Sequence, residues 1–511
     1  MNISIITEQT EFLSDIGDVF RIFFGTAAIE IVPADAADDD VYRHSFSFDG
    51  KICRDTWEHG ASREVSATEM PDQDSLLRKR LRKRAIKKTL YDLLRKETGI
   101  KPPWGSLTGI RPTRLYYEGL NLGLTPDQSV CRLINEFDVS PDRAELLRSI
   151  SDMQAGILYP GKNEFDLYIG IPFCTTRCSY CSFSSGEIGD GSLVEPYVKA
   201  LLYEIVACAE MVRERGLKLR AGYVGGGTPT AIPCSQLKRI LKKALEEFPG
   251  AREWTVEAGR PDTIDETKLS MLKANGVTRI SVNPQTFSDE TLRRIGRAHT
   301  GADTIRAFAL ARKLGFDDIN MDLIAALPGE TPDDFSHTLD RVIDLAPESV
   351  TVHSLAIKHS SRLHEEAVIS GKDVPSPSAA APASMTREAR MRLTESGWFP
   401  YYLYRQKYVA GNQENIGYAR PGKACLYNIG NMEETVSVLA LGAGSISKWL
   451  FDREAASGPI GMDISATRFS NLELRIERAA NVRSIEQYIQ RTSEMVDRKR
   501  ALILGKGDES I

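Results

Sequence analysis

The sequence predicts an α/β protein whose central parallel sheet is wrapped by helices and curls into an open or closed barrel. Two observations predict this class. Short β-rich runs alternate with helical segments between about residues 164 and 360, and polar or metal-binding residues follow the ends of these runs. Repeated βα alternation favours a parallel sheet with helical crossovers. Because active residues of such barrels gather at the carboxyl ends of the strands, we expect the functional site there.

The predicted strands are short runs rich in β-branched, aromatic and small residues. Each is followed by an amphipathic segment with the period of a helix. The strands are expected at 166–171, 221–226, 253–258, 278–283, 319–327 and 349–357. The helices between and after them are expected at 193–214, 234–248, 265–276, 288–296, 302–315 and 332–346.

A chain of 511 residues exceeds what one hydrophobic core holds, so it should divide into domains. We predict an N-terminal α+β extension at 1–160, the barrel at 161–370, and a small C-terminal domain at 371–511 that covers the barrel mouth. The segment "GKDVPSPSAAAPAS" (371–384) has the composition of a linker. A Lys/Arg-rich helix is expected at 76–99. It could bind an anionic partner, but a solvated face balanced by nearby acidic residues is the favoured interpretation.

Composition argues against several classes of function. A net charge of −5 gives no global reason to expect binding to nucleic acid or to a membrane. The N-terminus lacks the basic and apolar regions of a signal peptide, and no window approaches the roughly 18–20 apolar residues of a spanning helix. Eight cysteines are too few for a disulfide scaffold in a chain of this length. We therefore expect a cytoplasmic protein in a reducing compartment.

The strongest local signal is "LYIGIPFCTTRCSYCSFSSG" (167–186), which places Cys174, Cys178 and Cys181 at C-x3-C-x2-C spacing. Three thiolates can hold three corners of a [4Fe–4S] cluster and leave the fourth iron open for a small chelating ligand. Zinc is the main competitor, but structural zinc sites complete four ligands, and no His or Cys lies just beyond Cys181. Unrelated buried cysteines are the third possibility, and the other five cysteines are interpreted in that way.

Together with Tyr168 and "GGGTPT" (225–230), this loop resembles the radical S-adenosylmethionine (SAM) superfamily. Within it, the chain resembles the oxygen-independent coproporphyrinogen III oxidase group in "WTVEAGRPD", "RISVNPQTF", "IGRAHT" and "INMDLIAALPGETPDDF". The tail "YYLYRQKYVAGNQENIGYARPGKACLYNI" and the N-terminal "PPWGSLTGIRPTRL" most resemble the HemZ branch, the coproporphyrinogen dehydrogenases. The resemblance implies an α/β fold with a partial (β/α)6 TIM-type barrel.

The resemblance also implies roles for individual residues. Cys174, Cys178 and Cys181 would bind the [4Fe–4S] cluster, and SAM would chelate its open iron. Tyr168 would lie near the cluster and the substrate, as a cofactor contact and catalytic candidate, while a strand tyrosine equally fits the core. The remaining SAM contacts are expected at Gly226, Gly227, Thr228, Glu257, Gln285, Arg297, Asp322 and Ile324.

These expected SAM contacts divide by chemistry. The glycines let the backbone approach the methionine part of SAM, and Thr228 offers its hydroxyl and its N–H. Glu257 would pair with the SAM ammonium or ribose, and Arg297 would donate to the SAM carboxylate. The ribose hydroxyls would meet Asp322, and the adenosyl group would pack on Ile324 two residues along the same strand face.

The activity that the resemblance implies is that of a radical SAM oxidoreductase in haem biosynthesis. A SAM-derived 5′-deoxyadenosyl radical would take hydrogen from propionates of coproporphyrinogen III, and loss of CO2 and an electron would give the vinyl groups of protoporphyrinogen IX. An electron donor such as flavodoxin or ferredoxin would be the protein partner. Arg405 and Lys407 are the candidate cations for the propionates, and a solvated loop fits these two residues equally well.

One residue departs from the pattern of the group. Phe183 stands two residues past the third cysteine, where the best-known members carry a further cysteine. The departure is shared with HemZ-like proteins and with HemW-type haem chaperones. The alternative function is therefore a chaperone that binds the cluster, SAM and haem without decarboxylation.

Overall fold

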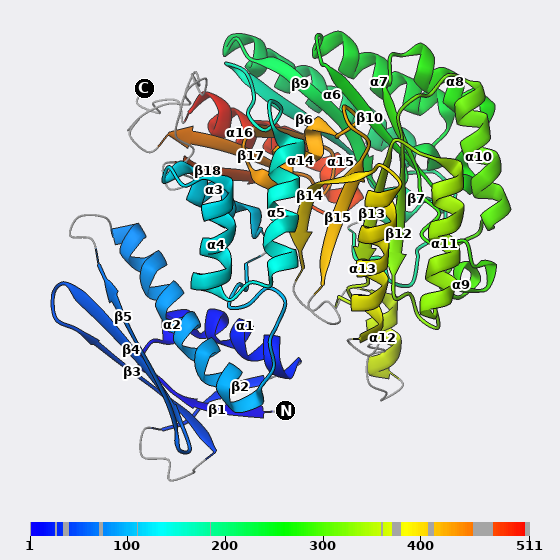
Figure 1. The fold of residues 1–511 in the computed structure, drawn as a ribbon. Helices are drawn as coiled ribbons and strands as arrows, with labels where there is room; N and C mark the ends of the chain where they lie inside the picture. Colours follow the sequence, from blue (N-terminus) through cyan, green and yellow to red (C-terminus); the bar gives the residue numbers. More distant parts are fainter. Residues whose placement is uncertain are drawn as a thin grey trace, which may run out of the picture. The chain divides into compact units, whose positions relative to one another are not determined.

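The computed structural model of the chain falls into two compact units, Met1–Arg148 and Ser149–Ile511 (Figure 1). The first boundary thus lies twelve residues before the predicted one, inside helix α5 (Pro141–Gln154). Each unit is described by itself. The structure describes residues 2–25, 28–33, 40–70, 75–109, 111–183, 185–358, 361–369, 380–406, 413–452 and 474–505.

The first unit contains a five-stranded mixed sheet in the order β2-β1-β3-β4-β5. Strand β1 pairs in parallel with β2 and β3, and β3, β4 and β5 are antiparallel. Buried residues of two helices and the sheet, such as Phe20, Trp57 and Leu90, form its core. The elements are β1 (Asn2–Ile6), α1 (Leu13–Phe24), β2 (Ala28–Ile31), β3 (Val41–Phe48), β4 (Ile52–His59), β5 (Ser62–Glu69), α2 (Ser75–Thr98), α3 (Thr113–Asn121) and α4 (Pro126–Phe137).

Helix α2 is the Lys/Arg-rich helix that the sequence predicts. Many of its cations pair with acidic residues of the same unit. Lys83 Nζ lies 2.6 Å from Asp15 Oδ1, and Arg95 Nη1 lies 3.1 Å from Asp138 Oδ2. This supports the interpretation that neighbouring acidic residues balance the charge of the helix, because these cations already have protein partners.

The second unit is built on an eleven-stranded sheet whose six central strands are parallel and follow one another in chain order. This confirms the predicted partial (β/α)6 barrel (Figure 1). The central strands are β6 (Glu164–Ile171), β9 (Lys218–Gly226), β10 (Glu253–Gly259), β11 (Arg279–Val282), β12 (Ile319–Ala325) and β13 (Ser349–Ser354). Their helices are α6 (Val194–Glu214), α7 (Cys234–Glu247), α8 (Glu266–Ala274), α9 (Asp289–Arg294), α10 (Gly301–Lys313) and α11 (Pro332–Leu345).

The predicted strand at 319–327 is two residues too long. Strand β12 ends at Ala325 because Ala326 has a φ of +63°, which turns the chain out of the extended conformation. Helix α8 begins one residue later than predicted, because the Asp265 side chain accepts a hydrogen bond from Lys268 N and so acts as its N-cap.

The described C-terminal residues do not form a separate unit, in contrast to the domain predicted at 371–511. They extend both edges of the barrel sheet. Strand β15 pairs antiparallel with β13 at one edge, and β16 pairs in parallel with β6 at the other. Edge strands carry unpaired N–H and C=O groups, and these added strands satisfy them. The elements are β14 (Phe399–Arg405), β15 (Glu414–Ala419), α14 (Leu426–Glu433), β16 (Ser437–Leu441), β17 (Ile446–Asp452), β18 (Leu474–Ala480), α15 (Ile485–Gln490) and α16 (Thr492–Leu504).

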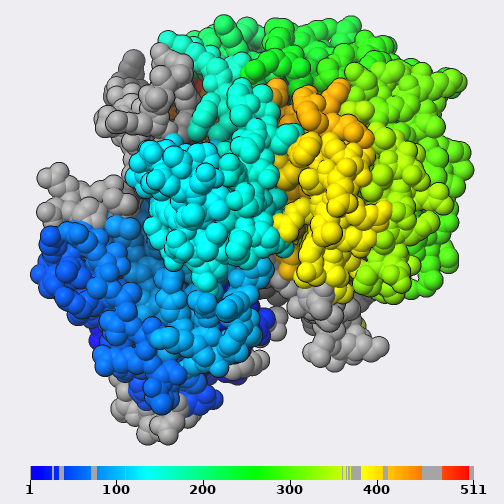
Figure 2. Space-filling view, in the orientation of Figure 1, coloured from blue at the N-terminus to red at the C-terminus, as the bar shows by residue number. Residues whose placement is uncertain are grey.

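Two more helices belong to this region, α12 (Arg362–Ile369) and α13 (Ala380–Glu395). Helix α13 begins inside the predicted linker, so the linker prediction fails from residue 380 on, while 371–379 lie outside the described residues. It lies on the surface beside α11 (Figure 2), where Arg392 Nη1 donates to Ser336 O at 3.2 Å. No helix in the described part of the chain is long and apolar enough to cross a membrane.

Buried ion pairs occupy the barrel at the amino ends of its strands. Arg220 donates to both carboxylate oxygens of Asp166, at 2.9 and 2.6 Å. Nearby, Arg279 Nη2 lies 3.1 Å from Asp318 Oδ2, and the Cys425 thiol donates to Glu253 at 3.1 Å. Burial of such charges is tolerated only when they are paired, as they are here. The predicted site residues lie toward the opposite ends of the strands.

Candidate functional site

The cysteine loop follows β6 directly. Cys174 ends the short strand β7 (Phe173–Cys174), which pairs with β8 (Gly186–Glu187), so the first cysteine is fixed by backbone hydrogen bonds. The hydroxyl oxygens of Thr228 and Ser185 lie 3.6 and 3.7 Å from Cys174 Sγ. Hydroxyls beside a thiolate sulfur stabilise its negative charge.

The other two cysteines are joined by a turn in which Cys181 N donates to Cys178 O at 3.1 Å. Burial raises the pKa of the Cys181 thiol, and the neighbouring thiols of Cys178 and Cys174 raise it further. Mutual repulsion of closely placed thiolates is relieved when each binds a cation. The side chain of Phe183, which stands two residues past Cys181, is 73% exposed and is not packed in the loop.

The described residues contain no group of three His, Cys, Asp or Glu side chains that could hold one metal ion. A [4Fe–4S] cluster does not need three side chains around one ion, because each of its cysteine ligands binds a separate iron. The ligands must therefore surround the cluster and need not converge on one point.

The glycine segment after β9 packs directly on the cysteine loop. A Cβ on Gly227 would lie 2.6 Å from Phe173 O and 3.0 Å from Cys174 Sγ, so only glycine fits there. Gly226 has a φ of +111°, which glycine adopts without strain. Thr228 N donates to Phe173 O at 2.7 Å. This N–H, which was expected to contact SAM, therefore already has a hydrogen-bond partner in the protein. Its hydroxyl faces Cys174 instead.

Glu257 lies on β10 and is half-buried. It accepts a hydrogen bond of 2.6 Å from the Tyr223 hydroxyl. Burial raises the pKa of Glu257 to about 7, and the charge of Asp322 adds to the shift, while the Tyr223 hydrogen bond opposes it. Glu257 is therefore a carboxyl group that changes charge near neutral pH.

Three tyrosine rings stack beside Glu257. The ring centroids of Tyr168 and Tyr223 are 6.2 Å apart, and those of Tyr223 and Tyr427 are 4.5 Å apart. Tyr168 thus belongs to an aromatic cluster within the barrel, next to the carboxylate expected to contact SAM. Sequence reasoning missed Tyr223 and Tyr427, although Tyr223 lies only two residues before the glycine segment.

Gln285, three residues past the end of β11, is joined through its backbone to Asp322 and Ile324 of β12. Gln285 has a φ of +66°, and its N–H donates to Asp322 O at 2.9 Å while its carbonyl accepts from Ile324 N at 3.0 Å. The buried Gln285 Oε1 has no hydrogen-bond partner among the described residues. A strained backbone and an unpartnered buried oxygen are features of a ligand site.

Asp322 is held by two amides that the sequence analysis did not select. Asn283 Nδ2 donates to Oδ2 at 2.7 Å, and Asn320 Nδ2 donates to Oδ1 at 2.8 Å. Ile324 follows on the same strand face and is buried against Leu292 and Leu327. Strand β12 therefore carries the two residues predicted for one face, the polar Asp322 and then the apolar Ile324.

Arg297 is 9% exposed and lies before α10. Its Nη1 donates to Asn283 O at 3.2 Å and its Nη2 to the Tyr180 hydroxyl at 3.4 Å, whereas the buried Nε has no partner in the described structure. Burial acts to lower the pKa of Arg297, but Tyr180 and Cys178 outweigh it and hold the pKa above its ordinary value. The site therefore contains a buried cation with an unused donor.

The two substrate candidates are placed less favourably. Tyr404 reaches His353, with its hydroxyl 3.3 Å from Nδ1, on the barrel face of β14. Since side chains alternate along a strand, Arg405 lies on the opposite face, and it is 5% exposed. It is not brought together with the other predicted residues. Lys407 lies outside the described residues.

The family model for the radical SAM superfamily matches residues 168–342. The "oxygen-independent coproporphyrinogen-III oxidase-like protein HemZ" of Bacillus subtilis is 40% identical over 383 residues, which are 73% of this chain and 75% of HemZ. This chain belongs to the radical SAM superfamily and, within it, to the HemZ family.

Other radical SAM relatives are matched over shorter stretches. The haem chaperone HemW of Bacillus subtilis is 36% identical over 194 residues, covering 37% of this chain and half of HemW. Among solved structures, the coproporphyrinogen III oxidase HemN of Escherichia coli, described as a radical SAM enzyme, has a TM-score of 0.50 at 26% identity, over 68% of this chain and 73% of HemN.

Membership of the radical SAM superfamily implies a [4Fe–4S] cluster and SAM, and the residues fit both groups. Three cysteines share one loop, and Gly227 leaves the space that Cys174 needs. Around them lie unpartnered buried polar atoms of the described site, Gln285 Oε1 and Arg297 Nε, which a polar amino-acid moiety would satisfy. Asp322 and Glu257 add carboxylates for hydroxyl and ammonium groups.

Proposed function

We propose that the protein is an oxygen-independent enzyme that converts propionates of coproporphyrinogen III to the vinyl groups of protoporphyrinogen IX. The observation that carries the proposal is the match to HemZ, which extends over 73% of the chain and therefore well beyond the superfamily core at 168–342. The similarity to the E. coli oxidase HemN supports the same reaction class.

Tyrosine side chains of the barrel would suit the pyrrole rings of a tetrapyrrole substrate. Tyr402 and Tyr404 lie on the side of β12 and β13, where Tyr402 contacts the Thr351 hydroxyl at 3.3 Å. The stack of Tyr168, Tyr223 and Tyr427 lies beside Glu257. Aromatic faces pack well on flat pyrrole rings, and their hydroxyls supply polar contacts.

When bound, the cluster and SAM would supply the adenosyl radical for removal of one hydrogen from the propionate β-carbon, and the substrate would then lose CO2 and pass one electron to a one-electron acceptor. The chain's own part is to bind and orient. Arg297 and Glu257 would fix the two ends of the SAM amino-acid moiety, and Asp322 would fix the ribose. The buried ion pairs at the amino ends of the strands close that end of the barrel to water. We propose a flavodoxin or a ferredoxin as electron donor.

A haem chaperone that binds the cluster, SAM and haem is the second candidate. It is favoured by the 36% identity to HemW and by Phe183, which takes the place of the further cysteine. The HemW match covers only 37% of this chain, however, whereas the HemZ match covers 73%.

The test is product analysis on protein whose cluster has been reconstituted without oxygen. With coproporphyrinogen III, SAM and a chemical reductant, an enzyme releases CO2 and forms vinyl products. Tight, stoichiometric binding of haem without CO2 release would contradict the proposal and would support the chaperone.

A further inference from the structure

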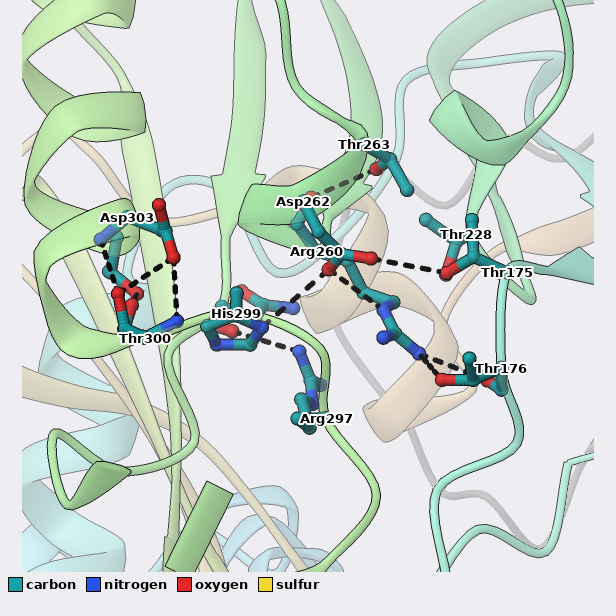
Figure 3. Close-up of polar contacts among 12 residues, drawn as sticks. Thr175, Thr176, Thr228, Arg260, Asp262, Thr263, Arg297, His299, Thr300 and Asp303 are labelled. Atoms are coloured by element: carbon teal, nitrogen blue, oxygen red, sulfur yellow. Dashed lines mark hydrogen bonds and ion pairs between the residues drawn. The ribbon is translucent and has the colours of Figure 1, made fainter. Parts of the chain in front are cut away.

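The loop between Cys174 and Cys178 is held by two side chains from the end of β10 (Figure 3). Arg260 is 3% exposed, and its Nη1 donates to both Thr176 O and Thr176 Oγ1, at 3.0 and 2.9 Å. Its Nε donates to Asp262 Oδ1 at 3.1 Å. One guanidinium group therefore joins the loop to a carboxylate two residues further along the chain.

Asp262 contacts the same loop directly. It lies in the short helix η3 (Pro261–Thr263), and its Oδ2 accepts from the Thr175 hydroxyl at 3.2 Å (Figure 3). Its Oδ1 is 3.6 Å from Nδ1 of the buried His299. Asp262 thus binds Thr175 while Arg260 binds Thr176.

The rest of the loop is fixed from other sides. Thr176 Oγ1 also donates to Gly296 O at 3.1 Å. Arg177 N donates to Glu187 at 3.1 Å, and the same carboxylate oxygen accepts from Arg362 at 3.1 Å. Every residue between the first two cysteines therefore has a hydrogen bond to a segment outside the loop.

We propose that Arg260 and Asp262 are positioning residues for the cluster, which hold the C-x3-C loop in its ligating conformation before iron binds. Ordering a loop costs conformational entropy. If the folded protein already orders the loop, the entropy of ordering it does not reduce the free energy of metal binding. The two residues touch neither iron nor substrate, and they act through Thr175 and Thr176.

The chain offers a matched control at the other end of the same strand. Arg252 directly precedes β10 and pairs with Glu164 at 2.7 Å, far along the strand from the cysteine loop. Arg252→Gln and Arg260→Gln therefore remove the same kind of group from the two ends of one strand, and only the second contacts the loop.

The first measurement is hydrogen exchange of the iron-free protein in the peptide that covers 174–181. In Arg260→Gln and Asp262→Asn we expect exchange there to be about tenfold faster, as loss of one charge-assisted hydrogen bond predicts, with no change in Arg252→Gln. Arg260→Lys should lie between, because one ammonium group cannot reproduce the fork that binds Thr176 and Asp262 together.

The second measurement is the rate at which reconstituted protein loses iron to a chelator without oxygen, together with the electron paramagnetic resonance spectrum of the reduced cluster. Faster iron loss and a changed spectrum are expected in the same variants. Thr175→Val removes only one exposed hydroxyl and keeps the test valid should the arginine variant fail to fold.

Wild-type exchange and iron loss in Arg260→Gln, Asp262→Asn and Thr175→Val would overturn the proposal. So would faster exchange spread evenly over the whole unit, since it would show general destabilisation and no specific hold on the loop. Neither measurement involves coproporphyrinogen, so failure of the proposed decarboxylation would leave this result unaffected.

Discussion

The Tyr223 hydroxyl donates a hydrogen bond of 2.6 Å to Glu257 Oε1, and this contact opposes the effect of burial on the carboxyl group. Burial nevertheless raises the pKa of Glu257 to about 7, above its ordinary value of 4.5. The group is therefore protonated below that pH and charged above it. If the charged form pairs with the SAM ammonium, SAM affinity should rise as the pH increases through about 7 and then level off.

The same contact predicts a shift in that profile. Tyr223→Phe removes a hydrogen bond to the charged form, so the pKa of Glu257 should increase further, by about one unit for a charge-assisted bond. SAM affinity measured by calorimetry from about pH 6 to about pH 9 would show the midpoint move upward. Tyr427→Phe is the control, because it keeps the stacked ring and the Tyr223 bond. Identical profiles in all three proteins would contradict the role of Glu257.

The three cysteines of the loop should be required for iron. Cys174→Ala, Cys178→Ala and Cys181→Ala should each abolish or sharply lower the iron content and the brown absorbance after reconstitution, because each removes one cluster ligand. Cys234→Ala should keep both, since Cys234 begins α7 on the outside of the barrel. Full iron in all three loop variants would refute the cluster assignment.

Gly227 should be required for a different reason. In Gly227→Ala, the new Cβ would lie 2.6 Å from Phe173 O and 3.0 Å from Cys174 Sγ, so the first cysteine must move. We expect lower iron content in soluble protein. Gly186→Ala on β8 is the control, since its nearest neighbour would be 3.9 Å away. Equal iron in both variants would show that the close packing on Cys174 is dispensable.

Arg297 should contribute to SAM binding and not to the cluster. Arg297→Ala removes a buried charge-assisted donor. The free energy of SAM binding should become less favourable by roughly 1.5–3 kcal/mol, and the iron content should be retained. Binding measured on reconstituted protein provides the check, and Glu257→Ala should behave in the same way. Unchanged SAM affinity in both variants would mean that the cofactor lies elsewhere.

The substrate assignment can be decided by comparing two faces of β14. His353 and Tyr404 lie toward the barrel, so His353→Ala should raise KM for coproporphyrinogen and leave reductive SAM cleavage intact. Arg405 lies on the other face and is buried, so Arg405→Ala should lower the free energy of unfolding by about 1–3 kcal/mol and leave KM unchanged. A higher KM at unchanged stability in Arg405→Ala would restore the substrate role predicted for that residue, and Lys407→Ala would then be the next variant to measure.

The barrel and the cysteine site could be predicted because their signals are local. The period of the βα units and the spacing of Cys174, Cys178 and Cys181 are each contained in short stretches of sequence. The hold of Arg260 on Thr176 could not be predicted in this way, because the two residues are 84 positions apart and meet only when strands β6 and β10 are assembled. The strands at both sheet edges were missed for the same reason.

The pairing of β6 with β16 has a consequence for how the protein is made. Phe165 and Ser437 are neighbours in the sheet, yet the ribosome adds them 272 positions apart. The nascent chain therefore exposes its cysteines early, in a loop that follows a strand whose second neighbour does not yet exist. Strand pairs this distant in sequence form slowly, and open strand edges associate readily with other chains. Strand β6 therefore keeps one open edge until Ser437–Leu441 has been synthesised, and the barrel sheet is completed late.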